Sequence, residues 1–164
     1  MSSGGRDRHY DWKTRLKRAM SFPNRQQAQQ FLEETGRPAM EAVREELMKQ
    51  SVQVDISDGT QNDDDYLSLY VDLGNEQNFA YQIWTHPFST PSFAMQTPRS
   101  SSRYYRLEVY LLEGSQGYDL MGYTREQVID DILDQYERHL QFLHLNRMEP
   151  GSINMPDSPE QPPG

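Results

Sequence analysis

Two histidines in the last third of the chain are the first candidates for metal chemistry. His139 and His144 are five positions apart, which is about 140° around a helix, so they cannot share a metal ion as an i, i+4 pair can. His9 and His86 lie in other segments of the chain. We therefore expect no metal site built from the histidines.

The acidic residues suggest two further kinds of chemistry. Asp63, Asp64 and Asp65 form a run that could attract calcium, but the glycine and the distal glutamate of an EF-hand loop are not at the required offsets. Glu108 and Glu113 are five positions apart, so on a strand they would point to opposite faces. We therefore expect residues 58–65 to form a solvated acidic turn. We expect no catalytic pair of carboxylates.

Nucleophilic and phosphate-binding motifs lack the residues that they require. The chain contains no cysteine, and no serine stands in the glycine-flanked elbow of a hydrolase. Gly114, Gly117 and Gly122 do not have the spacing of a nucleotide-binding fingerprint, so they predict a loop. We expect no enzyme activity and no cofactor.

Aromatic residues are the remaining candidates for a binding site. Tyrosine and tryptophan boxes can bind quaternary ammonium groups, although aromatic residues on strands more often serve packing. A small-molecule site on an aromatic sheet face, or beneath the glycine loop, stays open as a hypothesis. The residues expected on that face are Tyr66, Tyr70, Trp84, Tyr104 and Tyr110.

Helical signals begin at Asn24, which can cap a helix with Gln27 three positions later. The apolar stripe that follows is interrupted by Gly36 and Pro38 but continues in phase beyond them. This pattern predicts either two helices, about 25–35 and 38–50, or one kinked helix.

Alternating apolar residues predict four strands within 51–57, 66–73, 78–88 and 103–113. The short connections favour antiparallel pairing. The expected fold class is α+β, in the order α-α-β-β-β-β-α, with a four-stranded antiparallel sheet. The N-terminal helices and a long C-terminal helix are expected to pack on one face of this sheet.

The C-terminal helix begins at a predicted capping box made by Thr124 and Gln127. Phe142 and Leu145 lie outside its apolar stripe and are candidates for contact with a partner, as is the loop 87–102. The stripe itself is about 100° wide, as expected of a helix that packs on a core. Its residues are Ile129, Ile132, Leu133, Tyr136, Leu140 and Leu143.

Charge is distributed unevenly along the chain. Residues 1–25 hold seven basic and two acidic residues, a net +5, whereas the whole chain carries −9, which leaves −14 for the rest. The net charge argues against a nucleic-acid partner. A basic segment can instead lie on anionic lipid headgroups, and the candidate membrane-contact residues are Lys13, Arg15, Lys17 and Arg18.

The composition also predicts how the chain is organised. Residues 1–23 are expected to form a flexible basic linker, 24–149 a single domain, and the proline-rich 150–164 a disordered tail. No apolar run approaches the ~20 residues of a membrane helix, so we expect this chain to be soluble.

Four stretches resemble one known family. They are DWKTRLKRAMSFP (11–23), RPAMEAVREEL (37–47), NFAYQIW (78–84) and the long block YYRLEVYLLEGSQGYDLMGYTREQVIDDILDQYERHLQFLHLNR (104–147). The resemblance is to the cytoplasmic C-terminal domain of BetT-type high-affinity choline transporters, within the betaine/choline/carnitine transporter family.

The resemblance implies a parent protein in the bacterial inner membrane. Such a parent would be trimeric and would move choline inward for conversion to betaine, and this domain would follow its last membrane helix and serve osmotic control. The implied partners are the transporter's own membrane domain and anionic lipid, and the basic residues near position 15 fit the positive-inside rule. The family's choline site lies in membrane helices, so no residue here inherits it. An interaction module or a small-molecule sensor remains the alternative.

Overall fold

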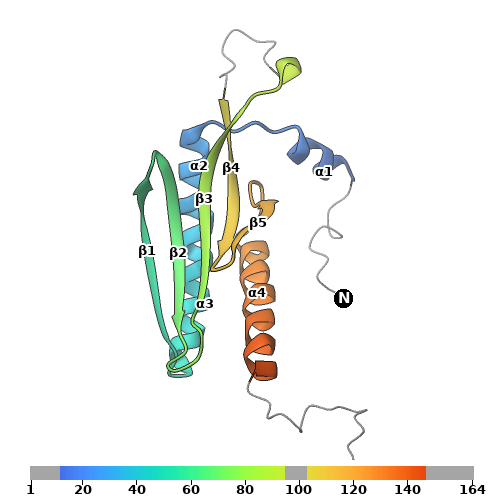
Figure 1. The fold of residues 1–164 in the computed structure, drawn as a ribbon. Coiled ribbons are helices and arrows are strands. Elements are labelled where there is room, and N and C mark those ends of the chain that lie inside the picture. Colours follow the sequence, from blue (N-terminus) through green and yellow to red (C-terminus); the bar gives the residue numbers. More distant parts are fainter. Residues whose placement is uncertain (1–11, 95–102, 147–164) are drawn as a thin grey trace, which may run out of the picture.

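A five-stranded antiparallel sheet forms the centre of the structure, a computed structural model that describes residues 12–94 and 103–146 (Figure 1). Each strand pairs with its neighbours in the sequence, so the order is β1-β2-β3-β4-β5. The α+β class is as predicted, with one strand more than expected. The strands are β1 (Gln53–Gln61), β2 (Asp64–Asp72), β3 (Phe79–Ser89), β4 (Arg103–Leu111) and β5 (Gly114–Asp119).

The larger helices cover one face of this sheet, and α3 packs beside α4 (Figure 1). The predicted capping boxes are both present, since the Asn24 and Thr124 side chains accept from the amides of Gln27 and Gln127. The helical segments are α1 (Trp12–Ala19), α2 (Arg25–Phe31), a π-helical turn (Leu32–Gly36), α3 (Arg37–Lys49), a short 3-10 turn (Ser92–Ala94) and α4 (Arg125–Asn146).

The helix over 25–49 is continuous, and a π-helical turn lies at its centre. The Arg37 amide donates to the Leu32 carbonyl, which is the i to i+5 bond of a π turn. This wider turn comes directly before Pro38, which has no amide hydrogen to donate and whose ring would crowd a regular α-helical turn. Of the two predicted alternatives, the single irregular helix is the one found.

The acidic segment expected to be a turn is mostly strand. The connection between β1 and β2 contains only Asn62 and Asp63, which both have positive φ, 54° and 69°. Positive φ at both central residues defines a type I′ turn, whose twist suits a hairpin. Asp58 and Asp65 therefore lie on paired strands.

The loop predicted from Gly114, Gly117 and Gly122 is wrong in its first half, which forms β5. Leu111 pairs with Gly114, which leaves Leu112 and Glu113 as the hairpin turn. Gly114 has a φ of 121°, a conformation that favours glycine. The segment Gly114–Asp119 is polar and does not alternate, so periodicity could not identify it as a strand.

Helix α4 is rotated relative to its predicted orientation. Ile132 and Leu143 are buried, and Ile129 and Tyr136 pack against the core while partly exposed. The structure corrects the rest of the stripe: Leu133 and Leu140, expected in the core, are 39% and 40% exposed. The helix instead buries Val128, Asp131 and Gln135, because the last two are hydrogen-bonded inside the domain.

Candidate functional site

Helix α1 carries the predicted basic residues and stands apart from the sheet and the other helices (Figure 1). Lys13, Arg15 and Lys17 are exposed, whereas Arg18 is partly buried. The structure therefore divides the four candidate membrane-contact residues into three that face outward and one that faces the body of the domain.

Arg18 docks on the segment that precedes α4. Its guanidinium carbon lies 5.2 Å from the centre of the Tyr123 ring, a cation–π geometry. Its methylene chain passes over Gly122, where an added Cβ would come within 2.5 Å of the Arg18 Cδ atom. Gly122 also has a φ of 91°. A glycine at this position thus gives the arginine room to reach the tyrosine.

The segment after α1 is attached to β4 by two contacts. The Tyr105 amide donates to the Pro23 carbonyl over 2.8 Å. The Phe22 ring meets the Tyr104 ring edge-on at 5.2 Å and the Phe93 ring at 6.1 Å. Together with Arg18, these contacts fix how α1 leaves the domain.

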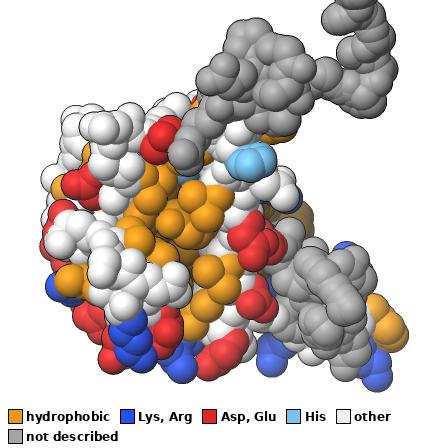
Figure 2. All heavy atoms as spheres, turned by 90° about the horizontal axis from the view of Figure 1, so that it is seen from below, with side chains coloured by type: hydrophobic (Ala, Val, Ile, Leu, Met, Phe, Trp, Pro, Cys, Tyr) orange, Lys and Arg blue, Asp and Glu red, His pale blue; other side chains and the backbone are white. Residues whose placement is uncertain are grey.

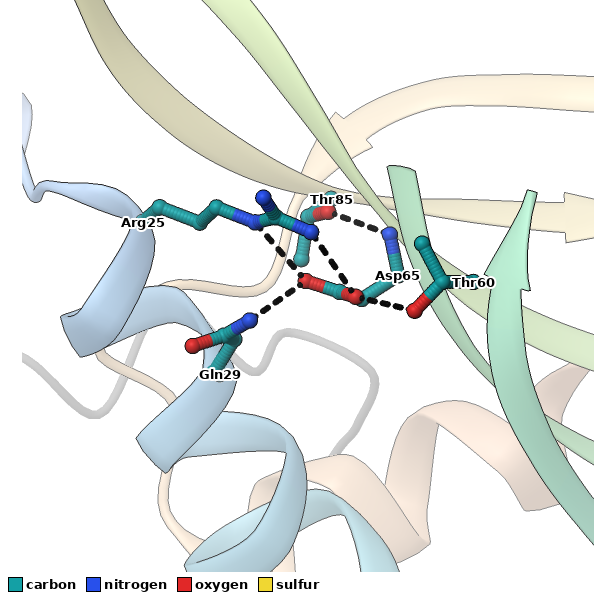
Figure 3. A network of polar contacts seen from close by, with 5 residues as sticks. All are labelled: Arg25, Gln29, Thr60, Asp65 and Thr85. Atoms are coloured by element: carbon teal, nitrogen blue, oxygen red, sulfur yellow. Dashed lines mark hydrogen bonds and ion pairs between the residues drawn. The ribbon is translucent and has the colours of Figure 1, made fainter. Parts of the chain in front are cut away.

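Asp65 ties the start of α2 to the first hairpin of the sheet (Figure 3). Arg25 donates to both Asp65 carboxylate oxygens at 3.2 Å, and Gln29 and Thr60 donate at 3.0 and 2.8 Å. The Asp65 amide donates to the Thr85 hydroxyl at 2.9 Å. The aspartate thus connects its own strand, β2, to α2, β1 and β3. Its carboxylate is occupied by these contacts and is not free to hold calcium.

Electrostatics favour the ionised form of this pair. Burial alone would raise the pKa of the Asp65 carboxyl, but hydrogen bonds from Arg25, Thr60 and Gln29 and the Arg25 charge lower it below its ordinary value. The same contact with Asp65 raises the pKa of Arg25. The pair therefore stays charged and intact at neutral pH.

The face of the sheet opposite the helices carries the expected aromatic residues. Tyr66 and Trp84 lie against each other with ring centres 4.8 Å apart, and Tyr110 meets Trp84 at 6.3 Å. His86 joins this group through contacts of 2.9 Å to Asp64 and to the Tyr110 hydroxyl. The rings of this group thus pack on one another.

A cavity of about 390 Å³ lies at the end of the molecule where α4 finishes. Figure 2 views this end and shows hydrophobic side chains gathered within a rim of charged and polar ones. His139 contacts the Gln77 carbonyl at 2.7 Å there and lies between the Phe79 and Phe142 rings. The remaining lining residues include Glu113, Gln116, Gln135 and Arg138.

The two predicted partner-contact residues lie on different sides of α4. Phe142 is 46% exposed and lines this cavity, whereas Leu145 is 63% exposed and lies beside Leu140 and His144. The structure therefore does not unite them in one surface. Half of the predicted partner loop 87–102, residues 95–102, lies outside the described residues, and the other half contains the end of β3 and the 3-10 turn Ser92–Ala94.

Two classes of site are absent from residues 12–94 and 103–146. No group of three or more histidine or acidic side chains gathers there to hold a metal ion. No helix in the same ranges is long and apolar enough to cross a membrane. His9 lies outside these ranges.

Comparison with known proteins places the chain among transporter segments. No family model matches it. It is 50% identical over 145 residues to the osmo-dependent choline transporter BetT2 of Acinetobacter baylyi, covering 87% of this chain and 21% of that protein. It is 48% identical over 153 residues to the high-affinity choline transport protein of Escherichia coli, covering 90% and 22%.

A more distant relative has a related name. The chain is 35% identical over 144 residues to the glycine betaine transporter of Acinetobacter baylyi, covering 86% of this chain and 21% of that protein. Homologues at 48–50% identity over most of the chain are thus choline transporters by name, which confirms the resemblance, and they are transporters, not enzymes. The chain spans about a fifth of the length of the curated relatives it matches.

Sequence reasoning missed the residues that attach α1 to the domain. The sequence predicts a loop at Gly122 and a strand that contains Tyr105, but it gives neither residue a link to the basic segment, and it gives Tyr123 no role. The available signal is a basic segment in a chain that is rich in aromatic residues, and that pattern does not specify which aromatic residue is the partner.

Proposed function

We propose that this chain is the cytoplasmic regulatory domain of an osmotically controlled choline transporter, and that it sets the transport rate without carrying choline. The similarity to an osmo-dependent choline transporter carries this proposal, since it extends over 87% of the chain but only 21% of the relative. No helix of the described residues could span a membrane, so the proposal gives this chain no part in a helical transport path. Control of transport is a role that suits such a segment.

Charge separation supplies a physical route to osmotic control. The first 25 residues carry +5 and the rest of the chain −14. Hyperosmotic shock raises internal ionic strength, and the Debye length falls from about 8 Å at 0.15 M to about 3 Å at 1 M. Contacts between exposed charges on the domain and charges on the membrane face of the transporter would weaken as salt rises.

A modest change in such contacts is sufficient for regulation. If one docked arrangement favours slow transport and another fast transport, a bias of about 1.4 kcal/mol changes their population ratio tenfold. The contacts of Arg18 and Phe22 with the body would transmit a movement of α1 to the domain.

Uptake of choline by cells that make the parent transporter tests the charge mechanism. Replacing Lys13, Arg15 and Lys17 by glutamine should shift the external osmolality at which uptake is half-activated. The matched control replaces three basic residues of the body, Arg44, Lys49 and Arg125, which changes net charge by the same amount and should leave the midpoint in place. Equal shifts in both variants would mean that net charge, and not the position of α1, is sensed.

The cavity beside Phe142 favours a second candidate function, the sensing of a small solute. Its lining combines aromatic rings with one basic and one acidic side chain, Arg138 and Glu113. Such a lining suits a small zwitterion or quaternary ammonium compound. Calorimetry of this chain with glycine betaine and with choline should then give saturable heat that Phe142→Ala abolishes and Leu145→Ala preserves. No heat with either compound would reject this candidate.

A further inference from the structure

Helix α1 has an apolar side that none of the body covers. Trp12, Leu16 and Met20 are 67%, 55% and 50% exposed. They are spaced four positions apart, and the Met20 amide continues the helical turn by donating to the Leu16 carbonyl at 3.0 Å. Residues with this spacing lie along one side of a helix.

The basic residues of α1 are distributed around this apolar side in two groups. At about 100° per residue, Lys13 and Lys17 border one edge of the stripe and Arg15 the other. Arg18 follows Leu16 by two positions, about 200° around the helix, so it lies on the opposite side. That opposite side is the one that meets Tyr123.

We propose that α1 lies in the plane of an anionic lipid bilayer, with Trp12, Leu16 and Met20 inserted among the acyl chains and Lys13, Arg15 and Lys17 at the phosphates. Arg18 does not contact lipid in this arrangement. It attaches the embedded helix to the body through Tyr123, so that the domain is held at a fixed distance below the membrane.

Charge complementarity identifies the partner as anionic lipid. An apolar stripe bordered by lysine and arginine is the pattern of a helix that rests at a membrane surface, and tryptophan is a side chain favoured at that depth. A second protein would need acidic groups on both borders of an apolar groove. A lipid bilayer supplies both features along its whole surface.

The inference rests on the proposed function only for the presence of a membrane beside the domain. It is tested with this chain and lipid vesicles alone, so its failure can be told apart from failure of osmotic control in the parent transporter. The probes are vesicles of equal parts phosphatidylglycerol and phosphatidylethanolamine, and vesicles of phosphatidylcholine.

Co-sedimentation with these vesicles tests the apolar stripe. Leu16→Asp should weaken binding to the anionic vesicles at least tenfold. The matched control is Leu112→Asp, because Leu112 is 57% exposed on the body and the change in charge and size is the same. Binding of Leu16→Asp at wild-type strength would overturn the proposal, as would equal binding of the wild type to both kinds of vesicle.

A second matched pair tests the division of the basic residues. Lys17→Gln should weaken binding about fivefold, because one basic residue near an anionic membrane surface contributes about 1 kcal/mol to binding. Arg18→Gln, one position later, should change binding less than twofold. Equal losses in the two variants would show that Arg18 also contacts lipid and would overturn its assignment as the attachment.

Fluorescence reports the depth of the helix directly. In a Trp84→Phe background Trp12 is the only tryptophan. Its emission should shift to the blue with anionic vesicles and should be quenched by lipids brominated on the acyl chain. A chain that binds vesicles without either change would have α1 held above the headgroups, and insertion would be excluded.

Discussion

Tyr81 on β3 donates its hydroxyl hydrogen to the Oδ2 atom of Asp131 on α4 over 2.6 Å, inside the core. Tyr118 from β5 donates to the same oxygen at 2.6 Å. Tyr81 is fully buried and Asp131 is only 2% exposed. Burial, with the neighbouring Asp131 as a further cause, raises the pKa of the Tyr81 hydroxyl well above its ordinary value. One carboxyl group of α4 therefore binds two tyrosines of the sheet, on the side of the helix that is buried.

Removing this acceptor should destabilise the domain strongly. Asp131→Ala leaves the buried Tyr81 hydroxyl without an acceptor, and it removes one of the bonds of the partly buried Tyr118 hydroxyl, which Gln135 still contacts. An unsatisfied buried polar group costs about 1–3 kcal/mol, so the free energy of unfolding should fall by about 2–3 kcal/mol. Urea denaturation measures this change. The neighbouring exposed Asp130→Ala should lower it by less than about 0.5 kcal/mol. Similar losses at the two positions would mean that the Tyr81 contact does not stabilise the fold.

The rotation of α4 can be tested at two adjacent apolar residues. Ile132 is fully buried, so Ile132→Ala should reduce the free energy of unfolding by about 2–4 kcal/mol through the cavity that it leaves. Leu133→Ala removes a partly exposed side chain and should cost less than about 1 kcal/mol. If Leu133→Ala were the more damaging change, α4 would face the sheet as its sequence pattern suggests.

Acid should weaken the attachment of α2 to the first hairpin. The pKa of Asp65 is lower in the folded state than in the unfolded chain, where it is about 3.9, so the stabilisation is complete above that value. It is lost as the pH falls through the folded-state pKa. The difference in unfolding free energy between the wild type and Asp65→Asn should therefore be largest above about pH 5 and should shrink below about pH 4.

The matched control for this titration is made in an Arg25→Gln background, which removes the other member of the pair. In that background the effect of Asp65→Asn on the free energy of unfolding should vary less with pH than it does in the wild type. A gap between the wild type and Asp65→Asn that stays constant down to the lowest pH would show that the Arg25–Asp65 pair has no linkage to protonation.

The sequence predicted most of the layered fold because its elements obey simple periodicities. The four strands with alternating apolar residues and both capping boxes are found as expected. The interruption of the helical pattern at Gly36 and Pro38 allowed two interpretations, two helices or one irregular helix. A π turn can continue a helix past a proline, and no local sequence pattern predicts such a turn.

The remaining features depend on contacts between distant parts of the chain. The stripe through Leu133 and Leu140 is the more apolar side of α4, but Tyr81 and Tyr118 offer hydrogen bonds that bring the polar Asp131 inward instead. The attachment of Arg18 to Tyr123 likewise joins two segments that are far apart in the sequence, and neither residue alone indicates its partner.

The central proposal is that this domain confers osmotic control on a choline transporter. The most direct measurement is the initial rate of choline uptake by the purified parent transporter in vesicles, with and without residues 11–164, as osmolality rises. We predict that the intact protein is activated, and that the truncated protein binds choline with unchanged affinity but transports it at a rate that no longer follows osmolality. A truncated protein whose rate rises with osmolality as the intact protein's does would contradict the account.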